Sequence, residues 1–274
     1  MFHHEKGHTN ENTELDKTLV REIKLARNIQ MKLLNGDKPQ LKNGTVSGIS
    51  IPARRIGGDY FDFYQLPDGK LRIIIGDVMG KGIPAAMLMI LTRGAFRSAA
   101  EKASGPAEIL TIMNHAIYDD LRSLGSFVTV LCADWDPERK ELSYASAGHC
   151  LPLVIRSEEC FLNIPHAGGV MLGGIPDVVY KQSAVYLDGE DVLFFYTDGI
   201  TEAQNQSGDM YRLTRLQQVL LENAHLDVKT LEEAVEQSVI EFTRGLPQKD
   251  DITMVTMKVN RVNAQADCCD SPLT

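Results

Sequence analysis

The strands and helices that this sequence predicts come in separate runs along the chain instead of alternating. Period-two hydrophobic patterns over 45–51, 60–66 and 70–77 predict a first run of strands. Residues 71–75 are almost all apolar, which predicts a strand covered on both faces. A helix pair, more strands, a second helix pair and one closing strand follow. Segregated runs of this kind favour an α+β fold with antiparallel sheet and argue against a doubly wound parallel sheet.

Proline and turn signals set several of the expected boundaries. Pro84 and Pro106 stand where the first turn of a helix accepts proline. The dipeptide Asp188-Gly189 predicts a hairpin between strands over 185–187 and 192–197. The remaining expected elements are helices over 84–102, 106–125, 212–223 and 231–242 and strands over 127–134, 141–147, 151–155 and 252–259.

Capping boxes mark two expected helix starts, Thr13 with Asp16 and Thr230 with Glu233. The first opens a leading helix that Asn35-Gly36 ends. Apolar residues at heptad spacing in this helix leave two alternatives open, a coiled coil and a helix packed on its own domain. These residues, in a row that Glu22 interrupts, are Leu15, Leu19, Ala26, Ile29 and Leu33.

We expect four segments in this chain of 274 residues. They are a flexible tail at 1–12, the leading helix at 13–40, one domain at 41–260 and a second flexible tail at 261–274. A domain of this size buries enough surface to fold without disulfides or structural metals.

Composition and charge exclude several classes of protein. The content of 43% hydrophobic and 24% charged residues is that of a soluble globular protein. A net charge of −9 argues against nucleic-acid partners and against docking on anionic membranes. The five cysteines form no C-x-x-C pair, and the longest apolar run, 85–91, is too short to span a bilayer. These features predict a cytoplasmic protein.

Four aspartates stand at the ends of strongly apolar strands: Asp59, Asp77, Asp198 and Asp250. A single Asp-Gly pair, as at Asp198, also fits an ordinary turn. Four buried carboxylates are costly unless they are paired or bind metal. If the strands converge, cations between the carboxylates would offset their repulsion. Oxygen ligands without His or Cys favour hard ions such as Mg²⁺ or Mn²⁺.

Five motifs resemble, in the same order, those of bacterial metal-dependent protein phosphatases of the PPM family, SpoIIE/RsbU branch. The resemblance spans roughly residues 26–258. It implies an α/β/β/α sandwich of two mainly antiparallel sheets flanked by helices, with two divalent cations at one end of the sheets. The motifs are Pro52–Asp62, Gly76–Ala86, Ala145–His149, Tyr196–Ala203 and Asp250–Thr253.

The resemblance also implies a role for each acidic residue. Asp77 would bridge the two metals, the carbonyl of Val78 and Asp59 would hold the second, and Asp198 would hold the first. Either Asp250 or, as the alternative, Asp251 would complete the first site, because the doubled acid leaves the register open. Asp59 and Asp77 would thus act in catalysis through a water bound to Mn²⁺ or Mg²⁺, which would attack the phosphoryl group.

Other motif residues have less specific expectations. Lys81 and Arg54 are candidates to steady a substrate phosphate, with a solvated or salt-bridged role as the alternative. Eukaryotic relatives carry a histidine, proposed as general acid, at the position of Met79 here. For His149 we expect a structural hydrogen bond in the turn between two strands.

The resemblance implies a phosphoserine/phosphothreonine protein phosphatase of bacterial partner switching. Its expected substrate is a phosphorylated anti-anti-sigma (STAS) protein. Two alternatives are a non-catalytic pseudophosphatase that binds phosphorylated partners and a hydrolase of a small phosphate ester. We further expect the helix over 13–34 to form a homodimer or to dock an activator protein, which would shift the helices over 84–124.

Overall fold

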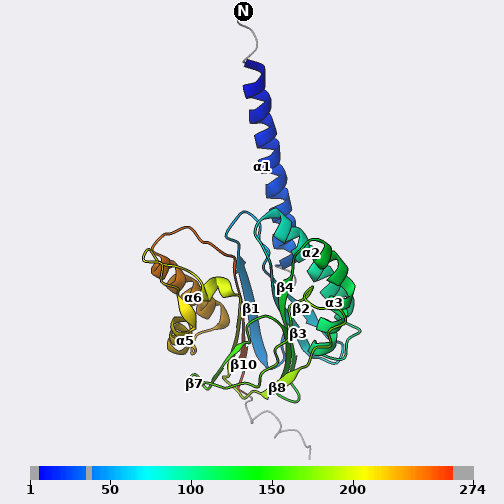
Figure 1. Ribbon diagram of the computed structural model, residues 1–274. Helices are drawn as coiled ribbons and strands as arrows, with labels where there is room; N and C mark the ends of the chain where they lie inside the picture. Colours follow the sequence, from blue (N-terminus) through cyan, green and yellow to red (C-terminus); the bar gives the residue numbers. More distant parts are fainter. Residues whose placement is uncertain (1–5, 35–38, 262–274) are drawn as a thin grey trace, which may run out of the picture.

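The computed structural model describes residues 6–34 and 39–261. It is a sandwich of two stacked β-sheets with a pair of helices on each outer face, and helix α1 (Lys6–Leu34) projects away from one end (Figure 1). The expected helix end at Asn35-Gly36 and the tail residues 262–274 lie outside the described residues. The expected α+β class is confirmed.

Each sheet has five strands, and all of the strand pairs that form the two sheets are antiparallel. The first sheet runs in the order β1 (Gly44–Ile51), β10 (Ile252–Val259), β9 (Val192–Tyr196), β6 (Leu153–Arg156) and β7 (Cys160–Phe161). The second runs in the order β2 (Tyr60–Gln65), β3 (Leu71–Val78), β4 (Val128–Asp136), β5 (Glu141–Ala147) and β8 (Ser183–Tyr186).

The helices cover the outer faces in pairs (Figure 1). The second sheet is covered by α2 (Ile83–Ala99) and α3 (Pro106–Ser123), and the first by α5 (Arg212–Asn223) and α6 (Val228–Thr243). A short helix, α4 (Asp198–Thr201), follows β9. None of the helices within the described ranges is both long enough and apolar enough to cross a bilayer.

Strand β3 shows why the sheets stack. Ile73 and Ile75 point into the core between the two sheets, whereas Ile74 and Val78 point into the core beneath α2 and α3. Successive side chains of a strand point to opposite faces, so an unbroken apolar run belongs to a strand that is covered on both sides. The prediction that 71–75 is buried on both faces is confirmed.

The expected hairpin around Asp188-Gly189 is wrong. β8 pairs with β5 in the second sheet, whereas β9 lies between β10 and β6 in the first. The buried Asp191 carboxylate accepts hydrogen bonds from the N–H of Asp188, at 2.9 Å, and of Ser157, at 3.1 Å. Leu187 is buried between the sheets. The turn therefore carries the chain from one sheet to the other.

Both predicted capping boxes are also wrong. Helix α1 begins at Lys6, so Thr13 lies inside it. Helix α6 begins at Val228, where the Asp227 carboxylate accepts hydrogen bonds from the N–H groups of Lys229 and Thr230. An aspartate upstream of the predicted cap thus satisfies the free N–H groups of the first turn.

A buried ion pair ties the second sheet to the end of α2. The Arg72 guanidinium, on β3, donates at 2.6 Å to each oxygen of Asp134, on β4. It also donates to the carbonyls of Ala100 and Ala103, which follow α2. Arg72 is only 1% exposed. Removing one partner of such a pair leaves a buried charge without compensation.

We therefore expect Asp134→Ala to lower the free energy of unfolding by about 3–5 kcal/mol, measured by urea denaturation followed by circular dichroism. The control is Glu138→Ala, which breaks the exposed pair with Lys42 and should cost at most about 1 kcal/mol. Equal losses in the two variants would contradict this assignment.

Candidate active site

Two aspartates lie at the same end of the second sheet. Asp59 directly precedes β2, and Asp77 lies next to the last residue of β3. The two strands are antiparallel, and Tyr60 pairs with Gly76. The start of β2 and the end of β3 therefore meet, which brings both carboxylates to one edge.

The first sheet contributes two more aspartates in the same way. Asp198 follows β9 and opens α4, and Asp250 lies just ahead of β10. β9 and β10 are antiparallel neighbours, with Tyr196 opposite Met254. These two aspartates thus also share one edge.

Side-chain hydrogen bonds join the two edges. Thr197, between β9 and α4, donates its hydroxyl to Asp59 Oδ2 at 2.7 Å. Asp251 Oδ2 accepts the N–H of Gly58 at 2.7 Å, and its Oδ1 accepts the N–H of Ala53 at 2.7 Å. The loop that joins β1 to β2 is thereby fixed against the start of β10. We call the cluster of Asp59, Asp77, Asp198, Asp250 and Asp251 the carboxylate rim.

The structure distinguishes the two adjacent acids of the rim. Asp251 is buried, and both of its oxygens accept backbone N–H groups. Gly57 packs so closely on it that a Cβ there would lie 2.3 Å from Asp251 Oδ2. The Asp250 side chain is 42% exposed and faces Lys81. Asp250 is therefore the carboxylate available to a ligand, and Asp251 supports the loop.

The rim carboxylates act on one another electrostatically. Burial, and next the charge of Asp77, raise the pKa of Asp59 well above its usual value. Burial, and next the charge of Asp198, raise the pKa of Asp77 to about 7. The pKa of Asp198 is raised by burial and by the charges of Glu202 and Asp250. This crowding of like charge is the arrangement that a bound cation would relieve.

The donors of the rim suit hard divalent cations by chemistry, because every side-chain ligand is a carboxylate oxygen. The carbonyl oxygen of Val78, at the end of β3, lies 3.0 Å from where a Cβ on Gly58, the neighbour of Asp59, would stand. Across residues 6–34 and 39–261, no three Asp, Glu, His or Cys side chains already surround a single point as a metal-binding group. The rim thus has the right donors, but its side chains would have to move to surround an ion.

Two cationic side chains lie at or near the loop that follows Asp77. Lys81 Nζ is 2.8 Å from Asp250 Oδ2 and also donates to the carbonyl of Lys249. Arg54 is exposed, with its Nη1 3.4 Å from where a Cβ on Gly82 would stand. Lys81 therefore belongs to the loop that follows Asp77, and Arg54 lies against the same loop at Gly82. In this structure Lys81 has the salt-bridged role expected as the alternative to phosphate binding, because its ammonium pairs with Asp250.

His149 lies beneath the rim and has the structural contacts expected of it. Its Nε2 is 3.1 Å from the carbonyl of Tyr196 and its Nδ1 is 2.9 Å from the hydroxyl of Thr129. A carbonyl only accepts, so Nε2 carries the proton and Nδ1 accepts from Thr129. Burial lowers the pKa of His149 to about 4. The ring is therefore neutral at pH 7.

Sequence reasoning missed two residues of the site. Thr197 belongs to a recognised motif, and its position beside Asp198 was a usable signal. Gln30, on α1, gave none: its side chain donates to the carbonyl of Gly57 at 2.7 Å and accepts the N–H of Gly57 at 3.2 Å. A side chain that bonds to backbone atoms can be paired with any residue type, so the sequence around Gly57 does not reveal that Gln30 contacts it.

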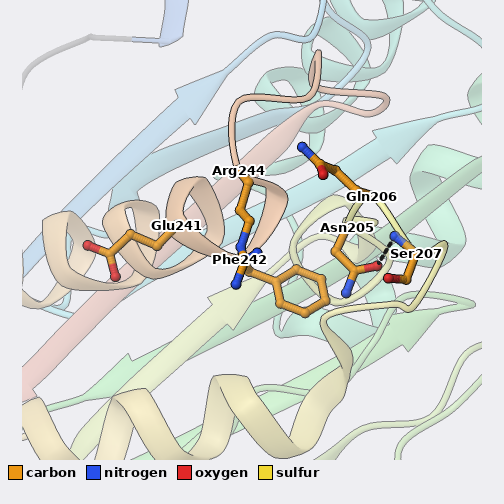
Figure 2. A pocket seen from close by; sticks show the side chains of 6 residues that line it. All are labelled: Asn205, Gln206, Ser207, Glu241, Phe242 and Arg244. Atoms are coloured by element: carbon orange, nitrogen blue, oxygen red, sulfur yellow. Dashed lines mark hydrogen bonds between the residues drawn. The ribbon is translucent and has the colours of Figure 1, made fainter.

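A separate hollow of about 340 Å³ lies between the loop after α4 and the end of α6. Figure 2 shows the Phe242 ring and Arg244 on one side and Asn205 with Ser207 on the other. Asn205 Oδ1 accepts the N–H of Ser207 at 3.0 Å. None of the rim aspartates lines this hollow, so it is not the candidate active site.

The buried His149 predicts a pH dependence of stability. Its folded-state pKa of about 4 is below the unfolded value of about 6.5, so the unfolded chain binds more protons between these values. The contribution of His149 to the free energy of unfolding should therefore be fully present above about pH 6.5. It should fall by about 3 kcal/mol as the pH is lowered toward 4. His149→Asn should lose this part of the slope in urea denaturation series. An unchanged slope in the variant would refute the assignment.

Comparison with known proteins agrees with the family resemblance, and the family match covers four of the five motifs, those from Gly76 onward. The family model described as Stage II sporulation protein E (SpoIIE) matches residues 67–260, well over half of the chain. The chain is 28% identical over 244 residues to "Phosphoserine phosphatase RsbU" of Bacillus subtilis. The alignment covers 89% of this chain and 72% of RsbU. It spans less than half the length of two other relatives.

Solved structures agree with the fold. The SiaA-PP2C domain of Pseudomonas aeruginosa superposes with a TM-score of 0.77 at 22% identity, covering 90% of this chain and 99% of that domain. RsbX, solved in complex with magnesium, gives a TM-score of 0.59 at 16% identity, covering 81% of this chain and 98% of RsbX. The expected PPM-type sandwich is confirmed. The chain therefore belongs to the SpoIIE family, and its two-sheet domain has the fold of PP2C phosphatase domains.

Proposed function

We propose that this chain is a metal-dependent phosphatase that removes phosphate from phosphoserine or phosphothreonine on a cytoplasmic protein substrate. The observation that carries the proposal is the carboxylate rim, where acidic residues from both sheets meet beside the cationic side chain of Lys81. A phosphoryl group needs both features, since divalent cations and positively charged side chains offset the charge on its oxygens.

The rim residues would divide between two divalent cations, Mn²⁺ or Mg²⁺. Asp77 would contribute to both, with Asp59 and the carbonyl of Val78 on one side and Asp198 and Asp250 on the other. The magnesium complex of RsbX supports the choice of cation. When bound, such ions supply an activated water for attack on phosphorus and neutralise charge on the phosphoryl oxygens.

Protein groups around the rim hold its geometry and orient the substrate. The hydroxyl of Thr197 fixes the carboxylate of Asp59, and Asp251 anchors the loop that carries it. Lys81 and Arg54 would bind the phosphoryl oxygens. The side chains of Lys81 and Asp250 are both about one-third exposed or more, so Lys81 can exchange its carboxylate partner for a phosphate at modest cost.

The proposed substrate is a phosphorylated anti-anti-sigma protein with a STAS fold, in a partner-switching pathway. Support comes from the similarity to RsbU, whose name describes it as a phosphoserine phosphatase, and from the family match. A pseudophosphatase would have degenerate metal ligands, whereas all of the expected carboxylates are present in this sequence.

We expect Asp77→Asn to lower the hydrolysis of p-nitrophenyl phosphate in Mn²⁺ by at least about 100-fold, because it removes the ligand shared by both metals. EDTA should abolish the wild-type activity. The control is Asp177→Asn, the same change at an acid whose side chain is 87% exposed, and it should retain full activity.

Normal turnover in Asp77→Asn, or activity that resists EDTA, would reject the metal-dependent mechanism. The same assay with a phosphorylated STAS protein, a phosphopeptide and small phosphate esters tests the substrate. We expect the STAS protein to have the highest kcat/KM. A preference for small esters would favour the ester hydrolase, and an inactive wild type that still binds phosphoproteins would favour the pseudophosphatase.

We also propose that α1 forms a homodimer over 13–34. Leu19 and Ile29, on the heptad row, are 50% and 61% exposed, and Leu25 beside them is also exposed. Among residues 16–34, for which burial is described, only Gln30 and Leu34, near the end of the helix, are buried. The two alternatives for this helix therefore apply to different parts of it: its end packs on its own domain and its upstream turns leave an apolar stripe for a second copy.

Light scattering coupled to size exclusion should give twice the chain mass of 30.4 kDa for the wild type. Leu19→Glu combined with Ile29→Glu should give a monomer, because charges at core positions of a coiled coil disfavour pairing. The exposed Lys17→Glu is the matched control and should remain dimeric. A wild-type protein that is monomeric at protein concentrations on the order of tens of micromolar would refute the dimer.

A further inference from the structure

A side chain of the leading helix binds the loop that presents Asp59. Gln30 Nε2 donates to the carbonyl of Gly57 at 2.7 Å, and Gln30 Oε1 accepts the N–H of the same residue at 3.2 Å. Both partners are buried, and Gln30 is only 4% exposed. One side-chain amide thus satisfies both polar backbone groups of a buried glycine, which would be left unpaired without it.

Gly57 is held from two sides. Besides the hydrogen bonds with Gln30, its Cα packs directly on the Asp251 carboxylate, leaving no room for a Cβ. The next N–H along the chain, that of Gly58, donates to Asp251 Oδ2 at 2.7 Å, and that of Asp59 approaches the same oxygen at 3.4 Å. The backbone that sets the position of Asp59 is therefore clamped between Asp251 and Gln30.

The two residues that hold Gly57, Asp251 and Gln30, belong to elements that are packed differently in the fold. Asp251 adjoins β10, in the interior of the first sheet. Gln30 belongs to α1, whose end packs at β2 while Leu19, Leu25 and Ile29 remain exposed. A change in the setting of α1 would therefore reach Gly57 through Gln30 while leaving Asp251 in place. This route is more direct than the expected shift of the helices over 84–124.

We propose that Gln30 is a positioning residue that sets the metal affinity of the rim by holding Gly57, and with it Asp59, in place. The inference rests on the proposed function, since it concerns the ligands of the proposed metal site. It predicts that loss of the Gln30 amide weakens metal binding without removing any ligand, as substitution of residues behind a metal ligand does elsewhere.

The test compares wild type, Gln30→Leu, Gln30→Glu and Gln40→Leu by isothermal titration calorimetry with Mn²⁺. Gln30→Leu keeps the approximate size of the side chain but removes both hydrogen bonds, and Gln30→Glu keeps an acceptor for the N–H of Gly57. Gln40→Leu is the matched control at an exposed glutamine. Thermal unfolding of each metal-free protein checks that it is folded.

We expect Gln30→Leu to bind Mn²⁺ about tenfold more weakly than wild type, with a smaller loss for Gln30→Glu and none for Gln40→Leu. The Mn²⁺ concentration for half-maximal p-nitrophenyl phosphate hydrolysis should rise by the same factor. At saturating Mn²⁺, kcat should recover to within about twofold, because the ligands themselves are intact.

The possible failures are distinguishable. If the wild type binds Mn²⁺ and folded Gln30 variants bind it equally well, the positioning role is wrong and the proposed function stands. If kcat falls while Mn²⁺ affinity is unchanged, Gln30 does not act through the metal site. If the wild type itself binds no Mn²⁺, the proposed metal site fails and the inference fails with it.

Discussion

The geometry of the candidate site depends on the hydrogen bonds that the Asp251 carboxylate accepts. Its two oxygens bind backbone N–H groups of Ala53 and Gly58, both at 2.7 Å. Bonds to an ionised acceptor are among the stronger hydrogen bonds in proteins. Through them the start of β10 fixes the loop between β1 and β2, which crosses from one sheet to the other. Together with the Thr197 hydroxyl, which donates to Asp59 at 2.7 Å, this contact holds the acidic residues of the two sheets in one arrangement.

Much of the fold and of the site could be predicted because the signals are local. Period-two patterning and strand-end aspartates at Asp59, Asp77 and Asp198 can be read without knowing which strands pair. The Asp188-Gly189 turn was mistaken for a hairpin because a turn sequence does not say which sheet the next strand joins. The choice between Asp250 and Asp251 needed burial, and Gln30 needed the position of a backbone carbonyl. Each of these depends on contacts between residues distant in sequence.

The carboxylate rim lowers the free energy of unfolding, and the rest of the fold offsets this loss. Burial and mutual repulsion raise the pKa of Asp59, Asp77 and Asp198, so the ionised cluster opposes folding in the absence of cations. Three hydrophobic cores, one between the sheets and one beneath each helix pair, supply the opposing stabilisation. Proteins commonly tolerate such conflicts where function requires them.

The ion pair between Lys81 and Asp250 has a consequence for the sequence of events at the rim. Lys81 gives Asp250 a cationic partner at 2.8 Å. If Asp250 held a divalent ion, as proposed, the Lys81 ammonium would lose this partner and become available to a phosphate group next to the ion. Loading with metal would thus precede and create the affinity for a phosphorylated protein, and the metal-free enzyme would hold little of its substrate in an unproductive complex.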